Sequence, residues 1–247
     1  MIGHPILELQ RVDSTNIYAN TLLSKGDLAE GTVVWAHEQF AGRGQHNNRW
    51  ESEAGKNLTF TLILKPVFLA PDRQFLLTKA MSLGVLDFIR NSLILPLSGI
   101  KWPNDIYIHH RKIAGILIEN KILGNSLETS VVGIGVNINQ TRYGADVLNP
   151  VSLVQLLHQE MELKEALHAI CKSMDGRYRM LLQNKIADLD LAYHHNLLGF
   201  DQWRVFRCKE LKMEGKICGV DGLGRLKIET RKGEILWFNH KEIEYTF

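Results

Sequence analysis

Cysteine is scarce in this chain, and the few cysteines present form no recognisable metal or redox motif. The 247 residues contain three, Cys171, Cys208 and Cys218, with no C-x-x-C pair and no histidine at zinc-site spacing. Scattered cysteines in odd number favour free, reduced thiols over a disulfide framework. We therefore expect a cytoplasmic protein.

Long apolar runs and an excess of one charge are also missing. The N-terminal segment MIGHPILELQ lacks the basic start and apolar run of a signal peptide, and no later segment has about eighteen consecutive apolar residues. The 29 basic and 27 acidic residues leave a formal charge of +2. Without a membrane segment or a strong electrostatic field, we expect no membrane and no nucleic acid among the partners.

Common phosphate-binding and nucleophile motifs are absent as well. Neither G-x-G-x-x-G nor G-x-x-x-x-G-K-[ST] occurs, so a bound nucleotide must be held in another way. Ser14 lacks a G-x-S-x-G context, which disfavours a hydrolase. The pairs His109-His110 and His194-His195 lack the i, i+4 spacing of a helical zinc site, so we interpret them as solvated histidines.

The chain does have enough apolar sequence for a sizeable core. It is 45% hydrophobic and 23% charged, which is typical of a soluble globular protein with one or two domains. Helical spacing of apolar residues predicts helices at 17–24 and 71–91 and helical segments between 150 and 198. Runs of β-branched and aromatic residues predict strands at 6–9, 31–38, 57–64 and 131–139.

The sequence changes character after residue 198. From Gln202 onward, short alternating runs are separated by glycines such as Gly215, Gly222 and Gly233. This pattern is typical of a small antiparallel barrel. It predicts a second domain with its boundary near Gly199.

The segment 39–56 joins two predicted neighbouring strands and is far longer than the about two to five residues that such a link needs. It carries Gly42 and Gly44, which allow a close backbone approach, and Arg43 and Arg49, whose guanidinium groups match carboxylate and phosphate oxygens. We interpret it as a lid that clasps an anion. Taken alone, the same pattern also fits a solvated surface loop with incidental arginines.

The segment 99–120 reads as two strands, 100–108 and 112–119, around a turn at 109–111. Because proline cannot donate to a strand ladder, we expect a bulge at Pro103. The bulge would turn Asn104 and Asp105 out of the sheet to bind a cation or hydroxyl groups. An ordinary turn at Pro103 is the alternative.

Other residues also indicate ligand binding. Lys101 and Lys112 supply ammonium groups suited to phosphate. Gly115, inside a predicted strand, leaves room for a ligand or another backbone. Near the N-terminus, the cluster from Asp13 to Asn16 predicts a helix start, whose spare hydroxyl and amide groups could bind a small polar ligand.

Five of these motifs, in this order, resemble those of the biotin protein ligases. They are Asp13-Ser14-Thr15-Asn16, Gly42-Arg43-Gly44 with Arg49-Trp50, Lys101-Trp102-Pro103-Asn104-Asp105, Lys112-Ile113-Ala114-Gly115-Ile116-Leu117-Ile118-Glu119 and Gly133-x-Gly135-x-Asn137. The resemblance covers almost the whole chain, because this family also ends in a small SH3-like barrel. One such motif would be weak, whereas five with compatible spacing are specific.

The resemblance implies an ATP-dependent reaction in two steps. The carboxylate of biotin attacks the α-phosphate of ATP in the presence of Mg²⁺, and the resulting biotinyl-5′-AMP biotinylates a lysine of a biotin carboxyl carrier protein. The catalytic residues that it implies are Arg43, Lys112 and Lys101. The implied biotin pocket consists of Ser14, Thr15, Asn16, Gln39, Gly42, Arg43, Lys112 and Gly115. The implied ATP or adenylate site consists of Arg43, Gln45, Trp50, Asn104, Asp105, Asn137 and Glu242, with Asp105 also meeting Mg²⁺ through ATP.

The implied fold is α+β. It combines a mixed-sheet catalytic domain over 1–198, with helices mainly on one face, and an SH3-like C-terminal domain over 199–247. Because the first motif starts at Asp13, we expect no N-terminal helix-turn-helix domain. Monomer and homodimer both stay open. Gln45 departs from the family pattern, in which many members have a second arginine, and it predicts a weaker hold on the adenylate.

Other functions stay open as alternatives. A lipoate-protein ligase or octanoyltransferase shares the catalytic fold, but the lid, the KWPND motif and the terminal barrel together favour biotin. A nucleic-acid-binding protein is disfavoured by the nearly neutral charge. A non-catalytic binding protein is disfavoured because Arg43, Lys101, Asp105 and Lys112 are all present.

Overall fold

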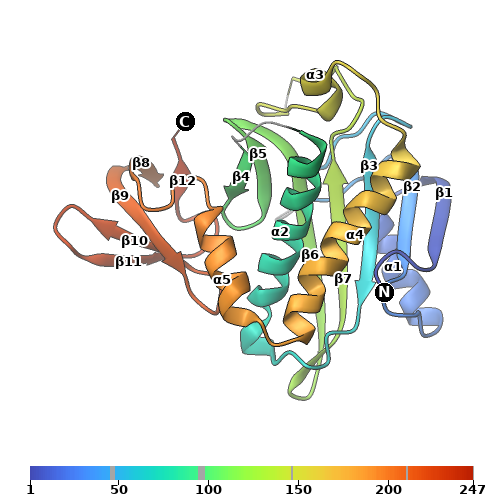
Figure 1. Cartoon of the computed structure of the whole chain (residues 1–247), viewed down its shortest axis with the longest axis horizontal. Helices are drawn as coiled ribbons and strands as arrows, with labels where there is room; N and C mark the ends of the chain where they lie inside the picture. The colour runs from blue at the N-terminus through green and yellow to red at the C-terminus, as the bar shows by residue number, and fades with distance from the viewer. Residues whose placement is uncertain (45–47, 94–97, 146, 210, 247) are drawn as a thin grey trace.

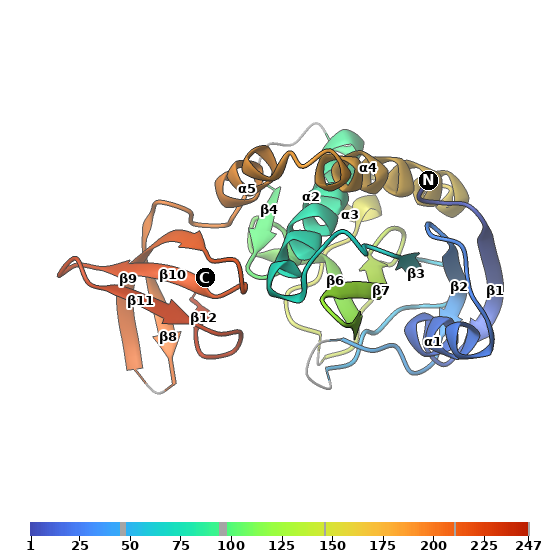
Figure 2. The same cartoon turned by 90° about the horizontal axis from the view of Figure 1, so that it is seen from below.

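The computed structural model describes residues 1–44, 48–93, 98–145, 147–209 and 211–246. Within these ranges a seven-stranded sheet forms the main body, and helices cover both of its faces (Figures 1 and 2). Its strands are β1 (Ile6–Val12), β2 (Val33–Gln39), β3 (Leu58–Leu64), β4 (Ser98–Lys101), β5 (Asp105–Ile108), β6 (Arg111–Leu123) and β7 (Ser126–Val136). The helices are α1 (Thr15–Lys25), α2 (Phe75–Ser92), α3 (Leu153–Leu157), α4 (Leu163–Leu182) and α5 (Ile186–His195), with a 3₁₀ turn, η2, at Pro71–Arg73.

The strand order in this sheet is β1-β2-β3-β7-β6-β5-β4. The strands β1 and β2 run parallel, and every other neighbouring pair is antiparallel. The parallel pair is possible because α1 makes the crossover between its strands. The predicted mixed sheet is confirmed, and so is the pairing of β2 with β3, the two strands that flank the segment 39–56.

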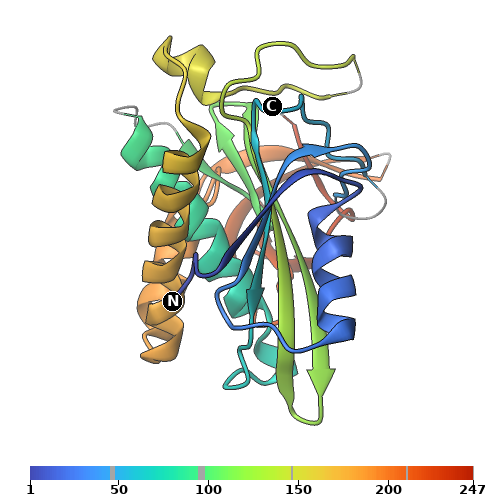
Figure 3. The ribbon, with the colours of Figure 1, turned by 90° about the vertical axis from the view of Figure 1, so that its right-hand side faces the viewer.

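The long helices α2 and α4 lie side by side on one face of the sheet, and α1 lies on the other (Figure 3). Gly84 of α2 permits this close packing, because a Cβ there would lie 2.7 Å from the Cα of Met174 in α4. Strand β3 is buried along its whole length, which explains why its sequence is apolar apart from threonines. The prediction of helices mainly on one face is confirmed.

The structure corrects the prediction of one strand over residues 100–108. Strand β4 ends at Lys101 and β5 begins at Asp105, so that the residues between them form a hairpin turn rather than a bulge. Proline suits a turn better than a ladder, since it has no N–H to donate. The hairpin matters for function because it sets Lys101 directly opposite Asp105.

The C-terminal part of the described chain forms a second sheet, five-stranded and antiparallel, in the order β11-β10-β9-β8-β12. Its strands are β8 (Trp203–Cys208), β9 (Leu211–Val220), β10 (Leu226–Thr230), β11 (Ile235–Phe238) and β12 (Glu244–Tyr245). The predicted small antiparallel unit is confirmed. Its boundary at residues 198 and 199, between α5 and β8, stays a prediction. Among the described helices, none has the length and apolar character needed to cross a membrane.

Candidate active site

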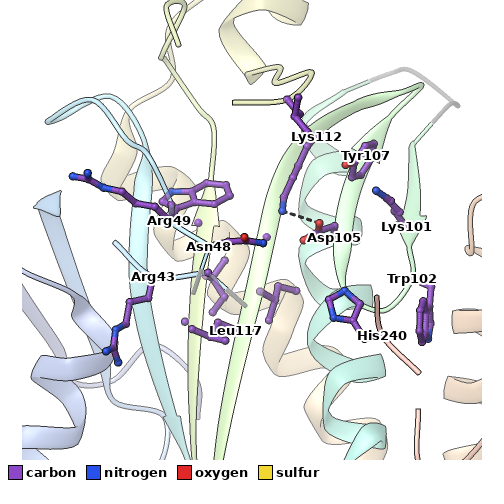
Figure 4. Close-up of a pocket in the computed structure, with 18 of the residues that line it drawn as sticks. Arg43, Asn48, Arg49, Lys101, Trp102, Asp105, Tyr107, Lys112, Leu117 and His240 are labelled. Carbon is purple, nitrogen blue, oxygen red and sulfur yellow. Dashed lines mark hydrogen bonds and ion pairs between the residues drawn. The ribbon is translucent and has the colours of Figure 1, made fainter. Parts of the chain in front are cut away.

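A cleft of about 540 Å³ lies where the first sheet, the segment 39–56 and the C-terminal sheet meet (Figure 4). One wall comes from the start of α1 and the facing strands of the sheet. Another comes from the β4–β5 hairpin and the first half of β6, and a third from residues 240, 241 and 243–245. These segments are far apart in the sequence, so only the fold brings their side chains together.

Three charged side chains converge in this cleft. Lys112 Nζ donates a hydrogen bond to Asp105 Oδ2 at 2.7 Å, and Lys101 lies beside this pair in Figure 4. The Lys101 ammonium lies 5.2 Å from the ring centre of Tyr107 and 5.8 Å from that of Tyr245. Burial, partly offset by Asp105, lowers the pKa of Lys101. Two ammonium groups with one carboxylate make a local environment that favours an anionic ligand.

The wall of the cleft at the start of α1 is built from uncharged polar side chains. Thr15 donates to Gln39 Oε1 from its backbone N–H at 2.7 Å and from its hydroxyl at 3.0 Å. The Asn16 amide donates to Glu119 at 2.9 Å and accepts from the Thr61 hydroxyl at 2.6 Å. Thr15, Asn16 and Thr61 are buried. This wall suits a polar, uncharged group rather than an ion.

The start of α1 leaves one hydroxyl free of the helix. Ser14 occupies the N-cap position, as the sequence predicts, yet its side chain makes no capping hydrogen bond. Its backbone N–H instead donates to Asp13 at 2.7 Å. Because Ser14 also lines the cleft, its hydroxyl can serve a ligand.

Three glycines make a flat strip across the sheet. Gly115 of β6 pairs with Gly135 of β7, and Gly133 lies two positions earlier on β7. A Cβ on Gly133 would lie 2.4 Å from Asn16 Oδ1, and one on Gly135 would lie 2.2 Å from the Trp50 ring. The sequence predicts a close approach at Gly115, and in the structure Trp50 makes it. The Trp50 ring would lie 3.2 Å from a Cβ on Gly115. The strip therefore accommodates planar groups.

In the segment 39–56, the described stretches 42–44 and 48–50 pair with each other as the two arms of a hairpin. The Trp50 backbone N–H donates to the Gly42 carbonyl at 3.0 Å, and an isolated bridge joins Arg43 to Arg49. A Cβ on Gly42 would lie 2.5 Å from the Trp50 carbonyl oxygen. In this structure Gly42 therefore permits a close contact within the hairpin itself.

Both arginines of the hairpin are exposed and lie apart from the lysines. Arg49 donates to the Phe40 carbonyl at 2.8 Å, and the Arg43 side chain points away from Lys101 and Lys112 in Figure 4. The structure does not bring Arg43 to the two lysines. To reach an anion held by the lysines, the hairpin would have to move.

Most of the site residues predicted from the sequence line the cleft. They are Ser14, Thr15, Asn16, Gln39, Arg43, Trp50, Lys101, Asp105, Lys112 and Gly115. Gly42 lies in a neighbouring hollow on the hairpin instead. Gln45 lies outside the described residues.

Three other predicted residues are not part of the lining and use their side chains elsewhere. Asn104 donates to the Ile116 carbonyl at 2.6 Å, which ties the β4–β5 turn to β6. Asn137 donates to the Val151 carbonyl at 3.1 Å and holds the chain after β7. The Glu242 carboxylate accepts a backbone N–H within its own turn. Their predicted contact with ATP stays a prediction.

The sequence analysis missed most of the wall made by the C-terminal sheet. Only Glu242 was predicted there, whereas the lining comes from its neighbours His240, Lys241, Ile243, Glu244 and Tyr245. The two sheets also meet at Trp102, whose indole N–H donates to the Gly224 carbonyl at 3.0 Å. The residues from His240 to Tyr245 belong to no motif. Thr61 was missed for a similar reason, because it reads as an ordinary threonine of a buried strand.

The cleft offers few ligands for a metal ion. In the described part of the chain, no group of three or more histidine, cysteine, aspartate or glutamate side chains could enclose one. Nucleotide-bound Mg²⁺ commonly takes only one or two protein carboxylates and completes its shell with phosphate oxygens and water. Asp105 fits such an ion as a single ligand, because Lys112 already engages one of its oxygens.

The sequence matches a family of ligases. The model of the biotin/lipoate A/B protein ligase family matches residues 8–137. The bifunctional ligase/repressor BirA of Bacillus subtilis is 30% identical over 237 residues, which cover 94% of this chain and 72% of that protein. A biotin–[acetyl-CoA-carboxylase] ligase of Paracoccus denitrificans is 38% identical over 135 residues, or 53% of each chain.

The fold is similar to that of solved biotin protein ligases. The enzyme from Aquifex aeolicus in complex with biotin and ATP superposes with a TM-score of 0.80 at 24% identity, covering 98% of this chain and 99% of that one. The enzyme from Leishmania major in complex with biotinyl-5-AMP gives a TM-score of 0.56 at 23% identity, with 95% and 98% covered. At these identities the likeness concerns the fold.

Proposed function

The chain belongs to the biotin/lipoate A/B protein ligase family and is a biotin protein ligase, and we propose that its cleft joins biotin to AMP before the biotinyl group passes to a carrier lysine. The observation that supports this most strongly is the convergence of Lys101, Asp105 and Lys112 in one cleft with an uncharged polar wall. Biotin has both matching parts, since its bicyclic ring is polar and uncharged and its side chain ends in a carboxylate.

The first step brings two anions together, which explains the need for the lysines. A carboxylate oxygen of biotin attacks the α-phosphorus of ATP, the bond to the bridging oxygen breaks, and pyrophosphate leaves. Lys112 and Lys101 reduce the repulsion between carboxylate and phosphate and stabilise the charge that develops on the α-phosphoryl oxygens. The Asp105 carboxylate holds the Lys112 ammonium in position.

ATP enters this scheme with Mg²⁺. Asp105 is the residue that would hold the ion, as one ligand beside the phosphate oxygens. When bound, Mg²⁺ neutralises phosphate charge and makes pyrophosphate a better leaving group. Trp50 and the residues of the C-terminal sheet supply the remaining wall for the nucleotide, and Asn104 and Asn137 act on it through the strands that they fasten.

The segment 39–56 closes over the bound ligands in this proposal. Arg43 and Arg49 are exposed in the structure, where Arg49 donates to the Phe40 carbonyl. An anion held at Lys112 would attract both guanidinium groups. Closure would also exclude water, which otherwise hydrolyses the reactive mixed anhydride.

The second step transfers the biotinyl group to a protein. The neutral amine of a carrier lysine attacks the carbonyl carbon of biotinyl-5′-AMP, AMP leaves, and an amide forms. We infer that the carrier is a biotin carboxyl carrier protein or domain, because the Paracoccus denitrificans relative carries the name of an acetyl-CoA-carboxylase ligase.

A lipoate-protein ligase or octanoyltransferase is the alternative within the same family. Lipoyl and octanoyl chains have no polar ring to pair with the amides and hydroxyls of Thr15, Asn16 and Gln39. Buried polar groups without partners are costly. The polar wall therefore favours biotin.

The test is to incubate the protein with ATP, Mg²⁺, a biotin carboxyl carrier domain and either biotin or lipoate, followed by intact-mass spectrometry. We expect one biotinyl group on one carrier lysine, and no lipoyl group. A carrier in which the lysine is replaced by arginine is the control and should gain no mass. Modification by lipoate in place of biotin would contradict the proposal.

A further inference from the structure

A row of buried side-chain oxygens behind the cleft makes more oxygen–oxygen contacts than it has hydroxyl hydrogens to place between them. Thr61 Oγ1 lies 2.6 Å from Asn16 Oδ1 and 2.8 Å from Thr15 Oγ1. Thr15 Oγ1 lies 3.0 Å from Gln39 Oε1. Two hydroxyl hydrogens must serve these three contacts, because amide oxygens only accept. One contact therefore brings two oxygens together without a hydrogen between them.

The amide groups at the ends of the row are held in place by other partners. Asn16 Nδ2 donates to the Glu119 carboxylate, which turns Asn16 Oδ1 toward Thr61. At the other end, Gln39 Oε1 accepts the Thr15 backbone N–H at 2.7 Å. Neither amide can supply the missing hydrogen by rotating without losing that partner.

The missing hydrogen is costly because the oxygens of the row are buried. Thr61 is 0% exposed, and Thr15 and Asn16 are 3% exposed each. Gly133 leaves the room that the Asn16 amide occupies, because a Cβ on Gly133 would lie 2.4 Å from Asn16 Oδ1. The cleft reaches this row at Thr15, Asn16 and Gln39, so a ligand can complete it.

An N–H group is the ligand feature that completes the row. Asn16 Oδ1 can only accept, so the Thr61 hydroxyl donates to it and the Thr15 hydroxyl donates to Thr61, which leaves Thr15 Oγ1 and Gln39 Oε1 facing each other without a hydrogen. A ligand N–H directed at these two oxygens supplies that hydrogen. An acceptor or an apolar group at the same place leaves the shortage unchanged.

We propose that Thr61 is a positioning residue that makes this wall select a ligand ring bearing N–H groups, by directing the hydrogen bonds of Thr15 and Asn16. The inference rests on the proposed function, in which that ring is the ureido ring of biotin. Sites built to hydrogen-bond a substrate N–H reject analogues that lack it far more strongly than apolar pockets do. Thr61 thus accounts for the preference for biotin over lipoate without touching either.

The test compares Thr61→Val with Thr61→Ser in a pyrophosphate-release assay without carrier. Valine has nearly the same shape as threonine and lacks the hydroxyl, whereas serine keeps it. For Thr61→Val we expect the KM for biotin to rise about tenfold to a hundredfold, which corresponds to a lost buried hydrogen bond. The KM for ATP should stay within about twofold, lipoate should remain inactive, and Thr61→Ser should resemble the wild type. A merely structural role would change the KM values for biotin and ATP together.

A second measurement uses the wild type alone, in case Thr61→Val fails to fold. Biotin methylated on its ureido nitrogens should be activated at least about a hundredfold less efficiently than biotin, whereas desthiobiotin, which keeps both N–H groups, should stay within about tenfold. Equal use of methylated biotin and biotin would overturn the inference, as would equal KM values for biotin in folded Thr61→Val and Thr61→Ser. If the wild type releases no pyrophosphate with biotin, the proposed function itself fails.

Discussion

Lys112 and Lys121 are two lysines of the same strand, β6, in different surroundings. The Lys112 side chain is 30% exposed and pairs with Asp105 inside the cleft, whereas that of Lys121 is 73% exposed and pairs with Glu128 at the far end of the strand. Lys112→Ala should lower the rate of pyrophosphate release about a hundredfold or more, because the lost ammonium acts mainly on charge that appears in the transition state. Lys121→Ala is the matched control and should keep the wild-type rate.

Circular dichroism decides how a loss of activity at Lys112 is to be interpreted. Neither partner of the Lys112–Asp105 pair is fully buried, so both alanine variants should fold and melt near the wild-type temperature. A folded Lys112→Ala protein with nearly normal pyrophosphate release would remove Lys112 from the catalytic residues.

The charged Lys101 side chain should lower the stability of the folded state, although the reaction needs its charge. Burial lowers its pKa below the ordinary value of 10.5, so the folded state binds this proton less tightly than the unfolded state. The charged form therefore destabilises the fold below the folded-state pKa, and stability is regained as the pH rises from there toward the unfolded value. Lys101→Met should melt at a higher temperature than the wild type at neutral pH, while losing activity.

The pH dependence distinguishes this explanation from a simple gain in apolar packing. The difference in melting temperature between Lys101→Met and the wild type should shrink in alkaline solution, as Lys101 becomes neutral in the wild type. A Lys101→Met protein that is less stable than the wild type at neutral pH would show that the ammonium contributes to folding.

At the scale of elements, the segment 39–56 should be protease-sensitive until ligands bind. Arg43 and Arg49 are exposed in the described arms of this segment. Ordering a loop costs about 1–2 kcal/mol per residue, so closure needs the attraction of an anionic ligand to offset it. Trypsin should cut after Arg43 or Arg49 in the free protein, and saturating biotin with ATP should slow this cleavage.

The chain supplies its own control for this digestion. Arg231 and Lys232 lie exposed in the turn between β10 and β11, away from the cleft lining. Cleavage there should proceed at the same rate with and without ligands. If cleavage after Arg43 and Arg49 is equally fast with both ligands bound, the segment does not close.

Element boundaries were predictable only where the sequence pattern matched a single strand or helix. Strands β2 and β3 and helix α2 have uninterrupted apolar patterns, and their positions were predicted within a few residues. The β4–β5 hairpin was not, because two short strands joined by a tight turn have the same apolar composition as one longer strand. The predicted bulge at Pro103 was wrong, and the hairpin instead pairs Lys101 with Asp105.

At the scale of the whole molecule, the C-terminal sheet should affect the nucleotide more than biotin. It lines the cleft beside Lys101, whereas the polar wall at Thr15 comes from the start of α1 and the first sheet. Gly224 joins the two parts: its carbonyl accepts the Trp102 indole N–H, and a Cβ on it would lie 2.5 Å from the Phe75 ring. Gly224→Ala should therefore loosen the contact between the sheets and raise the KM for ATP, with the KM for biotin nearly unchanged.

Gly222→Ala is the matched control, because a Cβ on Gly222 meets no atom within 4 Å. It should leave both KM values and the melting temperature at wild-type levels. Gly224→Ala should also lower stability by about 1–3 kcal/mol, because its φ of +91° disfavours any residue with a Cβ. An equal rise in the KM for biotin and ATP would mean that the contact between the sheets supports the whole cleft.

Contacts between distant parts of the chain were the least predictable from the sequence. The motifs identified residues whose chemistry is visible locally, such as Lys112 and Asp105. They could not show that residues 240–245 fold back onto the cleft, because such placement depends on packing across the two sheets. Nor could they show that Thr61 lies behind Thr15 and Asn16, since only the strand register puts it there.

The central claim is that this cleft by itself forms biotinyl-5′-AMP reversibly from biotin and ATP. The most direct measurement is the exchange of radiolabelled pyrophosphate into ATP, with Mg²⁺ and without carrier protein. We predict label in ATP when biotin is added, little or none with lipoate or without an acid, and about a hundredfold less with Lys112→Ala. Exchange that proceeds equally without biotin, or faster with lipoate than with biotin, would contradict the account.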